Sequence, residues 1–534
     1  MDNFWARLSA SILCAIVFCG ITIKTIGAMQ QGGYKNRTFY RWLRRGDNMF
    51  FNRLAVLSLC LALSTAVTAV AFSFLGRTWA LVVSAIPFLG LLGVFFAVDL
   101  KYALKVPIKL TGRFYRLTAV YFLFTGLISY AFIALLAFLA MKNGSDFYGI
   151  ISYLPFAVMP LLLPFILCLA NGVTRVFENA RNDRFVKRAG RVLNERQMIR
   201  VAVVGSFAKT SVKNILRSIL SERYEVVQTP ESYNTPIGVA KTVFSDGFEK
   251  KEVLIAEMGA RKSGDIAELC ALVKPDYAVF TGVCEQHISS FKNLENVFAE
   301  KSEIIKSGAR VVCAEGLRER IRESFGESVP NLSFALERSV TNLCLSATQT
   351  KFTLTLGEEK IEVQTSLLGY PAVENILLAS TLAKEMGLTA EEIARGIAKI
   401  EVVPHRLQLT ESGGVYILDD GYNSNPRGAT EALAALSRFS GRKCVVTPGI
   451  IECGVLEEKI NGVLGRKIAQ ERLDLVILIG DTLVGVVKKG YLENGGEENK
   501  LVVARSLDEA KALLSEWLQV GDAVLFLNDL PDVY

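Results

Sequence analysis

The chain has 534 residues, 51% of them hydrophobic, and a formal net charge of +7 at pH 7. Residues 1–200 hold 23 Lys and Arg against 7 Asp and Glu, whereas the remaining residues hold 37 against 46. Because the positive excess lies between apolar segments, we attribute it to membrane topology and do not expect nucleic acid as a partner. The ten cysteines form no CxxC pair, which argues against a disulfide framework or a zinc site.

Five apolar segments in the first third of the chain are long enough to cross a bilayer, which takes about 20 residues. They lie near residues 8–28, 53–75, 79–98, 117–141 and 149–171. The loops 29–52 and 99–116 carry five Lys and Arg each, and the two loops that alternate with them carry one each. The positive-inside rule therefore predicts a multi-pass cell-membrane protein with its N-terminus outside and everything after residue 172 in the cytoplasm.

Six basic residues follow the last predicted span: Arg175, Arg181, Arg184, Lys187, Arg188 and Arg191. They suit the anionic headgroups of membrane lipids, and the simpler alternative is that they only fix the topology. The span interiors carry no carboxylate or histidine relay, which argues against a pump or transporter. We therefore expect a transmembrane helical domain over 1–172 and a basic juxtamembrane linker over 173–197.

The soluble part begins with an apolar strand, Ile199–Val204, which a small-residue loop and a helical pattern over Val212–Leu220 follow. The loop reads Gly205-Ser206-Phe207-Ala208-Lys209-Thr210-Ser211. Strand, loop, Lys-Thr and helix is the order that cradles phosphates, with Lys209 at the β/γ-phosphates and Thr210 on Mg²⁺. The motif alone is weak, because Ala208 stands where glycine is usual and a plain strand–turn–helix fits equally well. If position 208 needs a positive φ, alanine costs about 1 kcal/mol there.

Two more predicted strands end in residues that suit a magnesium–nucleotide site. Val253–Ala256 is followed by Glu257, and Tyr277–Phe280 is followed by a segment that contains His287, one of only two histidines. Taken singly, Glu257 is consistent with a solvent-exposed glutamate at a strand end, and His287 with a histidine that makes a purely structural hydrogen bond. Ligands of open α/β sheets bind outside the carboxyl ends of the strands, so three such strand ends together favour a site.

Residues 404–534 alternate apolar runs with helical patterns, which predicts a second, mostly parallel, doubly wound α/β domain. Strands are expected at Val415–Leu418, Lys443–Thr447, Leu475–Ile479, Leu501–Val503 and Ala523–Leu527, with helices between them such as Gly428–Arg438 and Leu507–Leu518. Residues 198–403 then form the first soluble domain.

Eight segments, in the same order along the chain, resemble the Mur ligase family. They are Gly205–Ser211, Ser232–Gly238, Ile255–Ala260 with Gly264–Ile266, Thr281–His287, Glu300–Glu303, Pro404–Arg406, Asp419–Pro426 and Thr447–Gly449. The resemblance covers roughly residues 198–534 and is greatest to the branch that adds D-alanyl-D-alanine to a muramoyl tripeptide. It implies a P-loop-type central ATPase domain and a Rossmann-like C-terminal domain behind the α-helical membrane bundle.

The resemblance also implies ATP, Mg²⁺ and an acyl-phosphate route from a cell-wall precursor carboxylate to an amino acid or dipeptide amine. Nucleotide binding falls to Gly205, Lys209, Thr210 and Ser211 for the phosphates, Asn375 for adenine, and Arg406 and Asp420 for phosphate and ribose. Metal binding falls to Thr210, Glu257 and His287, and catalysis to Lys209, Asn234, His287 and Lys301. Lys301 matches the family's carbamylated lysine, and an exposed helix lysine is the alternative.

The chain departs from the family in three places. Ala208 replaces the loop glycine, and Gly369-Tyr370-Pro371-Ala372 replaces the usual Gly-Arg-His-Asn before Asn375. The membrane bundle stands where the family has a domain that binds UDP, so we prefer a lipid-linked or membrane-near acceptor. Two alternatives stay open: a non-catalytic, nucleotide-binding membrane scaffold, and a ligase for another polymer such as poly-γ-glutamate.

Overall fold

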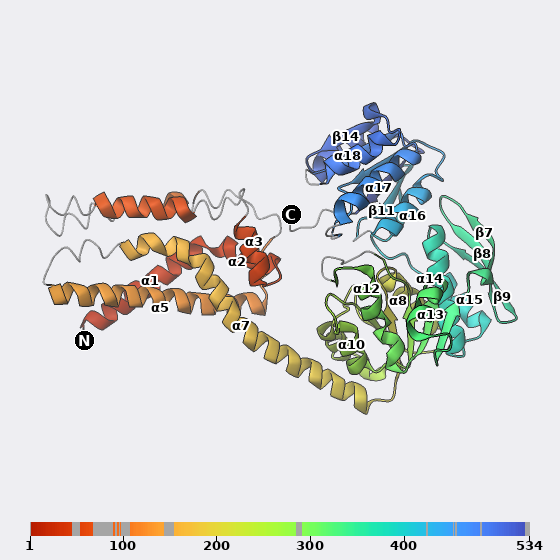
Figure 1. Cartoon of the computed structure of the whole chain (residues 1–534), viewed down its shortest axis with the longest axis horizontal. Coiled ribbons are helices and arrows are strands. Elements are labelled where there is room, and N and C mark those ends of the chain that lie inside the picture. The colour runs from red at the N-terminus through yellow and green to blue at the C-terminus, as the bar shows by residue number, and fades with distance from the viewer. Residues whose placement is uncertain are drawn as a thin grey trace. The chain divides into compact units, whose positions relative to one another are not determined.

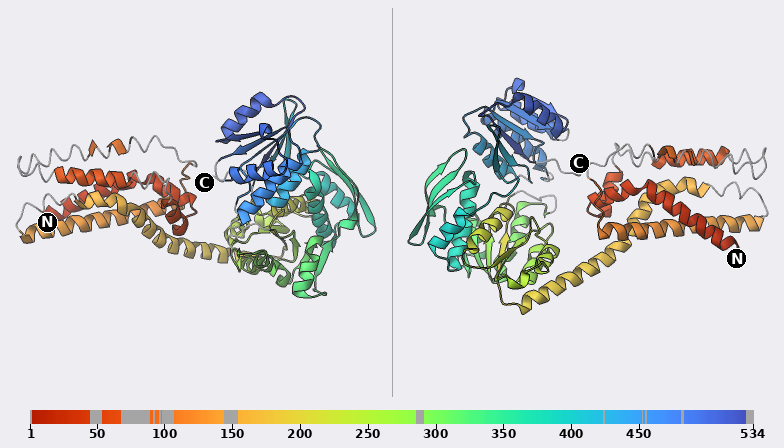
Figure 2. Two further views of the ribbon diagram at one scale, coloured as in Figure 1. Left: turned by 45° about the horizontal axis from the view of Figure 1, so that its top comes forward. Right: turned by 180° about the vertical axis from the view of Figure 1, so that it is seen from behind.

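The computed structural model describes residues 2–44, 54–67, 89–90, 93–95, 97, 107–143, 154–284, 291–422, 425–451, 453, 456–480 and 483–528. The chain divides into two compact units, Met1–Asp183 and Arg184–Leu530. Figure 1 shows the helices of the first unit in red to yellow and the α/β second unit in yellow to blue, and Figure 2 shows both from two further sides.

The described part of the first unit is helical. Its helices include α1 (Asp2–Ile21), α2 (Ile23–Gln31), α3 (Asn36–Leu43), α5 (Gly112–Asn143) and α7 (Leu154–Glu195), the last of which continues into the second unit. Phe18, Met29, Leu117 and Leu163 pack in its core. Large apolar side chains also stay exposed, such as Leu123 at 55% and Phe165 at 55%, as expected of helix faces that contact lipid.

Two helices of the described residues are long and apolar enough to span a membrane, over Gly112–Leu139 and Ala157–Glu195. A third span results if α1 and α2, which are bent by 53° at their junction, count as one. The predicted span 53–75 is described only over 54–67, as a shorter apolar helix, and the span 79–98 lies largely outside the described residues. The described helices therefore support two or three spans and do not support five.

The second unit begins with a six-stranded parallel sheet in the order β2-β3-β1-β4-β5-β6. Its strands are β1 (Ile199–Val204), β2 (Val226–Gln228), β3 (Val253–Met258), β4 (Tyr277–Phe280), β5 (Arg310–Ala314) and β6 (Leu332–Ala335). Alternate residues of β1 enter different cores: Val201 and Val203 face one, Ala202 and Val204 the other. Burial on both faces explains why β1, β3 and β4 were predictable as apolar runs.

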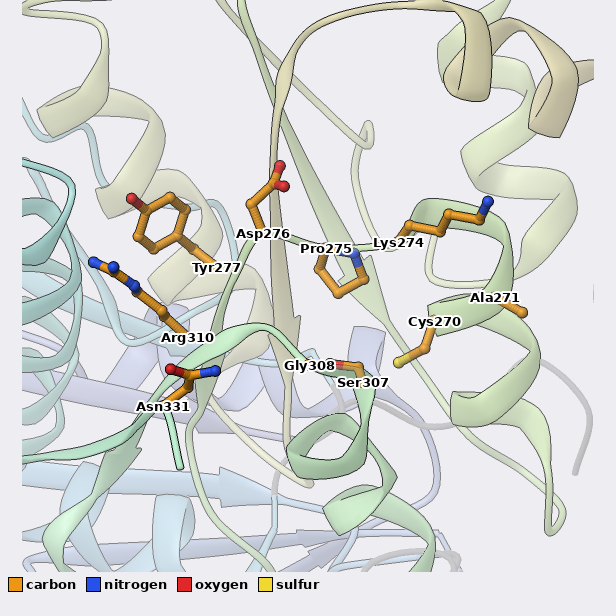
Figure 3. A pocket seen from close by; sticks show the side chains of 10 residues that line it. All are labelled: Cys270, Ala271, Lys274, Pro275, Asp276, Tyr277, Ser307, Gly308, Arg310 and Asn331. Atoms are coloured by element: carbon orange, nitrogen blue, oxygen red, sulfur yellow. The ribbon is translucent and has the colours of Figure 1, made fainter. Parts of the chain in front are cut away.

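A hollow of about 760 Å³ lies at the amino ends of β4 and β5. Figure 3 shows Tyr277 and Arg310 at the starts of these strands, with Lys274 on the preceding loop. The hollow therefore lies at the opposite edge of the sheet from the loop that follows β1.

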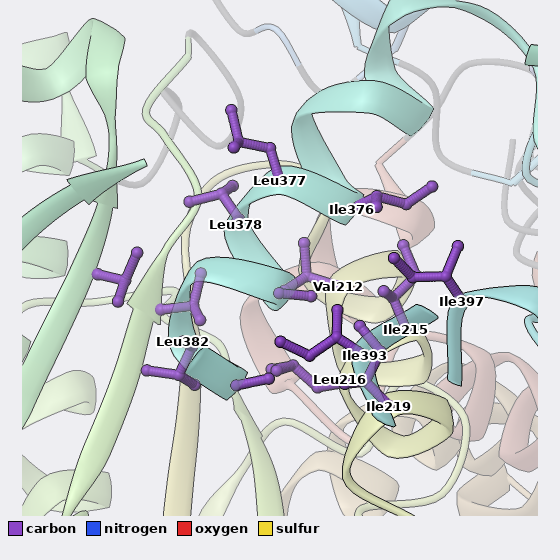
Figure 4. Packing of buried hydrophobic residues seen from close by; sticks show 14 of the residues in the cluster. Val212, Ile215, Leu216, Ile219, Ile376, Leu377, Leu378, Leu382, Ile393 and Ile397 are labelled. Atoms are coloured by element: carbon purple, nitrogen blue, oxygen red, sulfur yellow. The ribbon is translucent and has the colours of Figure 1, made fainter. Parts of the chain in front are cut away.

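Helices cover both faces of this sheet. On one face α8 (Lys209–Leu220) packs against α14 (Gly369–Glu385) and α15 (Ala390–Ala398) through Ile215, Ile376, Ile393 and other aliphatic side chains (Figure 4). On the other lie α9 (Pro236–Val243), α10 (Asp265–Val273), α12 (Leu294–Lys301), α13 (Arg318–Phe325) and the end of α7. The antiparallel sheet of β7 (Val340–Leu345), β8 (Thr350–Leu356) and β9 (Glu359–Thr365) was not predicted.

The last part of the second unit holds another six-stranded sheet, in the order β10-β11-β15-β12-β13-β14. The strands are β10 (Gln408–Ser412), β11 (Val415–Asp420), β12 (Lys443–Thr447), β13 (Leu475–Ile479), β14 (Leu501–Ala504) and β15 (Ala523–Leu527), with α16 (Pro426–Leu436), α17 (Glu457–Gln470), α18 (Val484–Glu493) and α19 (Leu507–Trp517) between them. Only β10 is antiparallel. The five predicted strands and the mostly parallel sheet are confirmed.

Candidate functional site

The loop between β1 and α8 is held by the residues that follow β4. The Thr281 hydroxyl donates a hydrogen bond to the carbonyl of Phe207 at 2.6 Å, and the amide of Ser206 donates to the carbonyl of Gly282 at 2.8 Å. A Cβ on Gly205 would lie 1.9 Å from Thr281 Oγ1, so this approach needs glycine. The loop therefore has a fixed shape at the carboxyl edge of the sheet, where β1 lies between β3 and β4.

Ala208 has a left-handed backbone, with φ 60° and ψ −3°, immediately before the first residue of α8. Position 208 therefore has the positive φ at which alanine is less stable than glycine by about 1 kcal/mol. Strained backbone of this kind persists where its surroundings fix it, and it is common in ligand-binding loops.

The Glu257 side chain connects Thr210 and Asn234, two other residues that were predicted for the site. Its side chain is buried, and its Oε2 accepts a hydrogen bond from the Thr210 hydroxyl at 2.9 Å while its Oε1 accepts one from Asn234 Nδ2 at 3.3 Å. A solvent-exposed glutamate is thereby excluded. A hydroxyl and a carboxylate oxygen are the donor types that Mg²⁺ prefers, so Thr210 and Glu257 fit the predicted metal.

Lys213 is a site residue that the sequence analysis missed. It is 1% exposed, its Nζ lies 3.2 Å from Glu257 Oε2, and it donates hydrogen bonds to the carbonyls of Thr229 and Glu231. Burial lowers the pKa of Lys213, and the charge of Glu257 opposes that shift. Nothing in the sequence distinguishes it from a surface lysine, because lysines often stand beside apolar residues such as Val212 and Leu216 on amphipathic helices.

In the described part of the chain, Lys209 and Lys301 form no ion pair with a carboxylate. Lys209 Nζ donates to the carbonyl of Ser206 at 3.3 Å, and burial lowers its pKa. Lys301, at the end of α12, is 3% exposed; burial lowers its pKa to about 7, and the charge of Lys209 acts in the same direction. The neighbouring Glu300 fixes this end of α12 by accepting hydrogen bonds from the amides of Gly264 and Ile266, both at 2.7 Å. An exposed helix lysine is therefore excluded at position 301.

Arg406 lies in a strained turn that carboxylates hold from β11. His405 and Leu407 on either side of it have φ of 60° and 47°. His405 Nδ1 is hydrogen-bonded to Asp419 Oδ2 at 2.7 Å, and the amide of Leu407 donates to Asp420 Oδ1 at 3.1 Å. The turn thus fixes the direction of the arginine side chain between them.

A cavity of about 140 Å³ connects the β1–α8 loop with this turn. Residues that line it include Ala208, Ser211, Asn375, Arg406 and Asp420, four of which were predicted for the nucleotide. Two further side-chain contacts join parts of the second unit that are distant in the sequence: Arg427 to Glu374 at 2.6 Å, and Tyr422 Oη to Ser232 Oγ at 3.1 Å. Four of the seven residues predicted for the nucleotide thus border one cavity, whereas the larger hollow of Figure 3 lies at the other edge of the sheet.

His287 lies outside the described residues, so its predicted place in the metal site stays a prediction. Within the described part of the chain, no group of three or more His, Cys, Asp and Glu side chains converges. The described metal candidates are therefore Thr210 and Glu257.

In the comparison with known proteins, residues 203–383 match the model of the Mur ligase middle domain. The UDP-N-acetylmuramoyl-tripeptide--D-alanyl-D-alanine ligase of Escherichia coli is 29% identical over 296 residues, which are 52% of this chain and 64% of that protein. The chain therefore spans just under two thirds of the length of this relative.

Two solved structures show the same fold in the second unit. MurF from Acinetobacter baumannii has a TM-score of 0.60 at 22% identity, over 66% of this chain and 78% of its own. MurF ligase from Thermotoga maritima in complex with ADP has a TM-score of 0.58 at 25% identity, over 66% and 81%. The α/β fold predicted for the soluble part is thereby confirmed.

We expect Ala208→Gly to raise the free energy of unfolding by about 1 kcal/mol, because glycine adopts the left-handed backbone without a Cβ clash. The measurement is denaturant unfolding of the detergent-purified protein. Ala512→Gly, in the exposed part of α19, is the control and should lower stability by about 1 kcal/mol. Loss of stability in both variants would contradict the strain at position 208.

We expect Lys213→Met to lower the free energy of unfolding by about 3–5 kcal/mol, because it leaves the Glu257 carboxylate buried and unpaired. Lys213→Met combined with Glu257→Gln should recover a large part of the loss, since the second change removes the unpaired charge. Lys489→Met at a surface position should change stability by less than about 0.5 kcal/mol. Additive losses in the double variant would show that the two side chains do not depend on one another.

Proposed function

We propose that this chain, whose residues 203–383 belong to the Mur ligase family, is an ATP-dependent C–N ligase that works through an acyl phosphate. One observation carries the proposal. Lys209, Thr210 and Glu257 gather at the carboxyl edge of a parallel sheet, beside a cavity that Asn375, Arg406 and Asp420 line.

In the proposed reaction an oxygen of the acceptor carboxylate attacks the γ-phosphorus of ATP, and the bond from that phosphorus to the β-phosphate oxygen breaks. The amine then attacks the acyl carbon, phosphate leaves with the electrons of the C–O bond, and the amine nitrogen loses a proton. Lys209 and Arg406 neutralise the charge that develops on the phosphate oxygens, which is the dominant contribution in phosphoryl transfer. Mg²⁺, held by Thr210 and Glu257 and in the prediction by His287, would supply further positive charge when bound.

The remaining residues hold the reactants and exclude water. Asn234 orients Glu257, and Ser211 and Asn375 border the nucleotide cavity. Arg427 and Glu374, which are in contact, also line this cavity. Exclusion of water matters because an acyl phosphate hydrolyses when water reaches it.

We further propose a cell-wall precursor as the acceptor and an amino acid or dipeptide as the amine, by analogy with the substrates named for the Escherichia coli relative. The apolar helices favour an acceptor at the membrane, because anchoring the enzyme raises the effective concentration of a bilayer-bound substrate. An N-terminus outside and a ligase in the cytoplasm, as the loop charges predict, belong to this proposal. A nucleotide-binding scaffold is the second candidate, and the strained Ala208 is the observation that favours it.

The test of activity is ADP release by the detergent-purified protein with ATP, Mg²⁺ and a panel of carboxylate acceptors and amines. We expect release that requires both acceptor and amine, and we expect Lys209→Ala to lower it by a factor of about 10²–10³, the usual effect of losing one charge-stabilising group. Lys306→Ala, at an exposed position, is the control. Tight ATP binding without acceptor-dependent release for the whole panel would favour the scaffold instead.

Lys301 should form a carbamate with CO₂ at and above neutral pH, because its pKa of about 7 leaves much of the amine neutral. ¹³C NMR of the protein in labelled bicarbonate should show a carbamate resonance. Because a pKa of about 7 leaves the Lys301 amine mostly neutral at pH 8 and mostly protonated at pH 6, the carbamate resonance should fade as the pH falls from 8 to 6.

The resonance should be absent from Lys301→Arg, whose guanidinium stays charged, and present in Lys306→Arg. A signal that persists in Lys301→Arg would contradict this assignment.

A further inference from the structure

Four arginines meet where α5 begins beside the middle of α7, and we name them the arginine cluster: Arg113, Arg116, Arg175 and Arg181. Glu178 is the carboxylate that pairs with them among the described residues. It is 5% exposed, its Oε1 accepts a hydrogen bond from Arg116, and its Oε2 accepts one from Arg181 at 3.1 Å. Each oxygen of the Glu178 carboxylate therefore already accepts a hydrogen bond from an arginine.

Arg113 has no such partner in the described part of the chain. Its guanidinium lies 4.0 Å above the ring of Tyr34, and its Nε is buried without a hydrogen-bond acceptor. The charges of Arg116 and Arg175 act on it as well as that of Glu178. Among the described residues, four guanidinium groups lie against one carboxylate, which leaves an excess of three positive charges, and a partly buried cation without a counter-charge is unfavourable. The described residues thus supply fewer anions than cations at the cluster.

The surface beneath Arg113 is fixed by polar contacts from three segments. Asn171 Nδ2, which is buried, donates to the carbonyl of Tyr34 at 3.0 Å, and Gln30 Nε2 donates to Tyr34 Oη at 3.1 Å. Gln30 also exchanges two hydrogen bonds with the backbone of Lys109, just before α5. Tyr34 therefore holds Arg113 in place, and α2, α3 and the start of α5 lie side by side here (Figure 1).

We propose that the arginine cluster binds the headgroup of a membrane lipid that carries a phosphomonoester or diphosphate. Arg113 is in the first turn of α5, where the apolar stretch Gly112–Leu139 begins, so it lies at headgroup depth if α5 spans the bilayer. Guanidinium groups bind phosphate oxygens in pairs, and an excess of three charges suits a dianion better than the single charge of a phosphodiester. This site is independent of the ligase reaction.

Native mass spectrometry of the full-length protein in neutral detergent tests the proposal, with dioleoyl phosphatidic acid, phosphatidylglycerol and phosphatidylcholine as probes. We expect phosphatidic acid to be retained over the other two, and Arg113→Gln to lower its retention about tenfold. Arg191→Gln is the matched control, because Arg191 is an exposed arginine on α7 outside the cluster. Equal loss in both variants would mean diffuse electrostatic attraction and would overturn the site.

Two further arms separate the remaining outcomes. Inorganic pyrophosphate should not displace the lipid; complete displacement would identify a free phosphate as the ligand and overturn the lipid. Equal retention of phosphatidylglycerol and phosphatidic acid would contradict the proposed preference for a dianionic headgroup. If Arg113→Gln does not fold, as judged by circular dichroism, Arg175→Gln replaces it, because Arg175 is exposed and makes no hydrogen bond to the frame around Tyr34.

Discussion

The candidate active site depends on the buried ion pair between Lys213 and Glu257. Each side chain is almost completely removed from solvent, so either charge alone would be strongly unfavourable and the two must stay together. The pair joins three elements: α8, which carries Thr210; β3, which carries Glu257; and the segment from Thr229 to Asn234. The predicted metal ligands and the phosphate loop therefore keep their relative positions before any ligand binds.

Three lysines and an arginine gather in the same region. Burial lowers the pKa values of Lys209, Lys213 and Lys301, and Arg406 lies within electrostatic range of Lys209. The charge of the Glu257 carboxylate acts on both Lys209 and Lys213. Such a concentration of cations in a partly desolvated place attracts an anion of high charge, and a triphosphate answers that description. The gathered cationic side chains and the shape of the loop thus favour the same class of ligand.

Much of the fold could be predicted because buried parallel strands are short, continuous apolar runs. Tyr277–Phe280 and Leu475–Ile479 were predicted with the bounds they have. β10 was missed because Gln408–Ser412 is largely polar and half exposed, and β7 because its residues are mostly exposed. Apolar pattern gives no signal for such edge strands.

The site was predictable where chemistry is tied to a motif, as at Lys209 and Thr210. It was not predictable where a charged group serves the backbone. Glu300 binds two amides of the loop before α10, and Lys213 binds two carbonyls, and neither partner leaves a pattern in the sequence. The left-handed backbone of Ala208 could be expected only if the loop had the shape of a phosphate cradle.

Helix α7 belongs to two hydrophobic cores at once. Leu163 and Leu167 pack in the core of the first unit, whereas Ala189 and Leu193 pack beneath the central sheet of the second. A chain cut at residue 197 would lack Ala189 and Leu193 and would expose the part of the central sheet that the end of α7 covers. A fragment that keeps the whole second unit therefore has to start at or before Arg184.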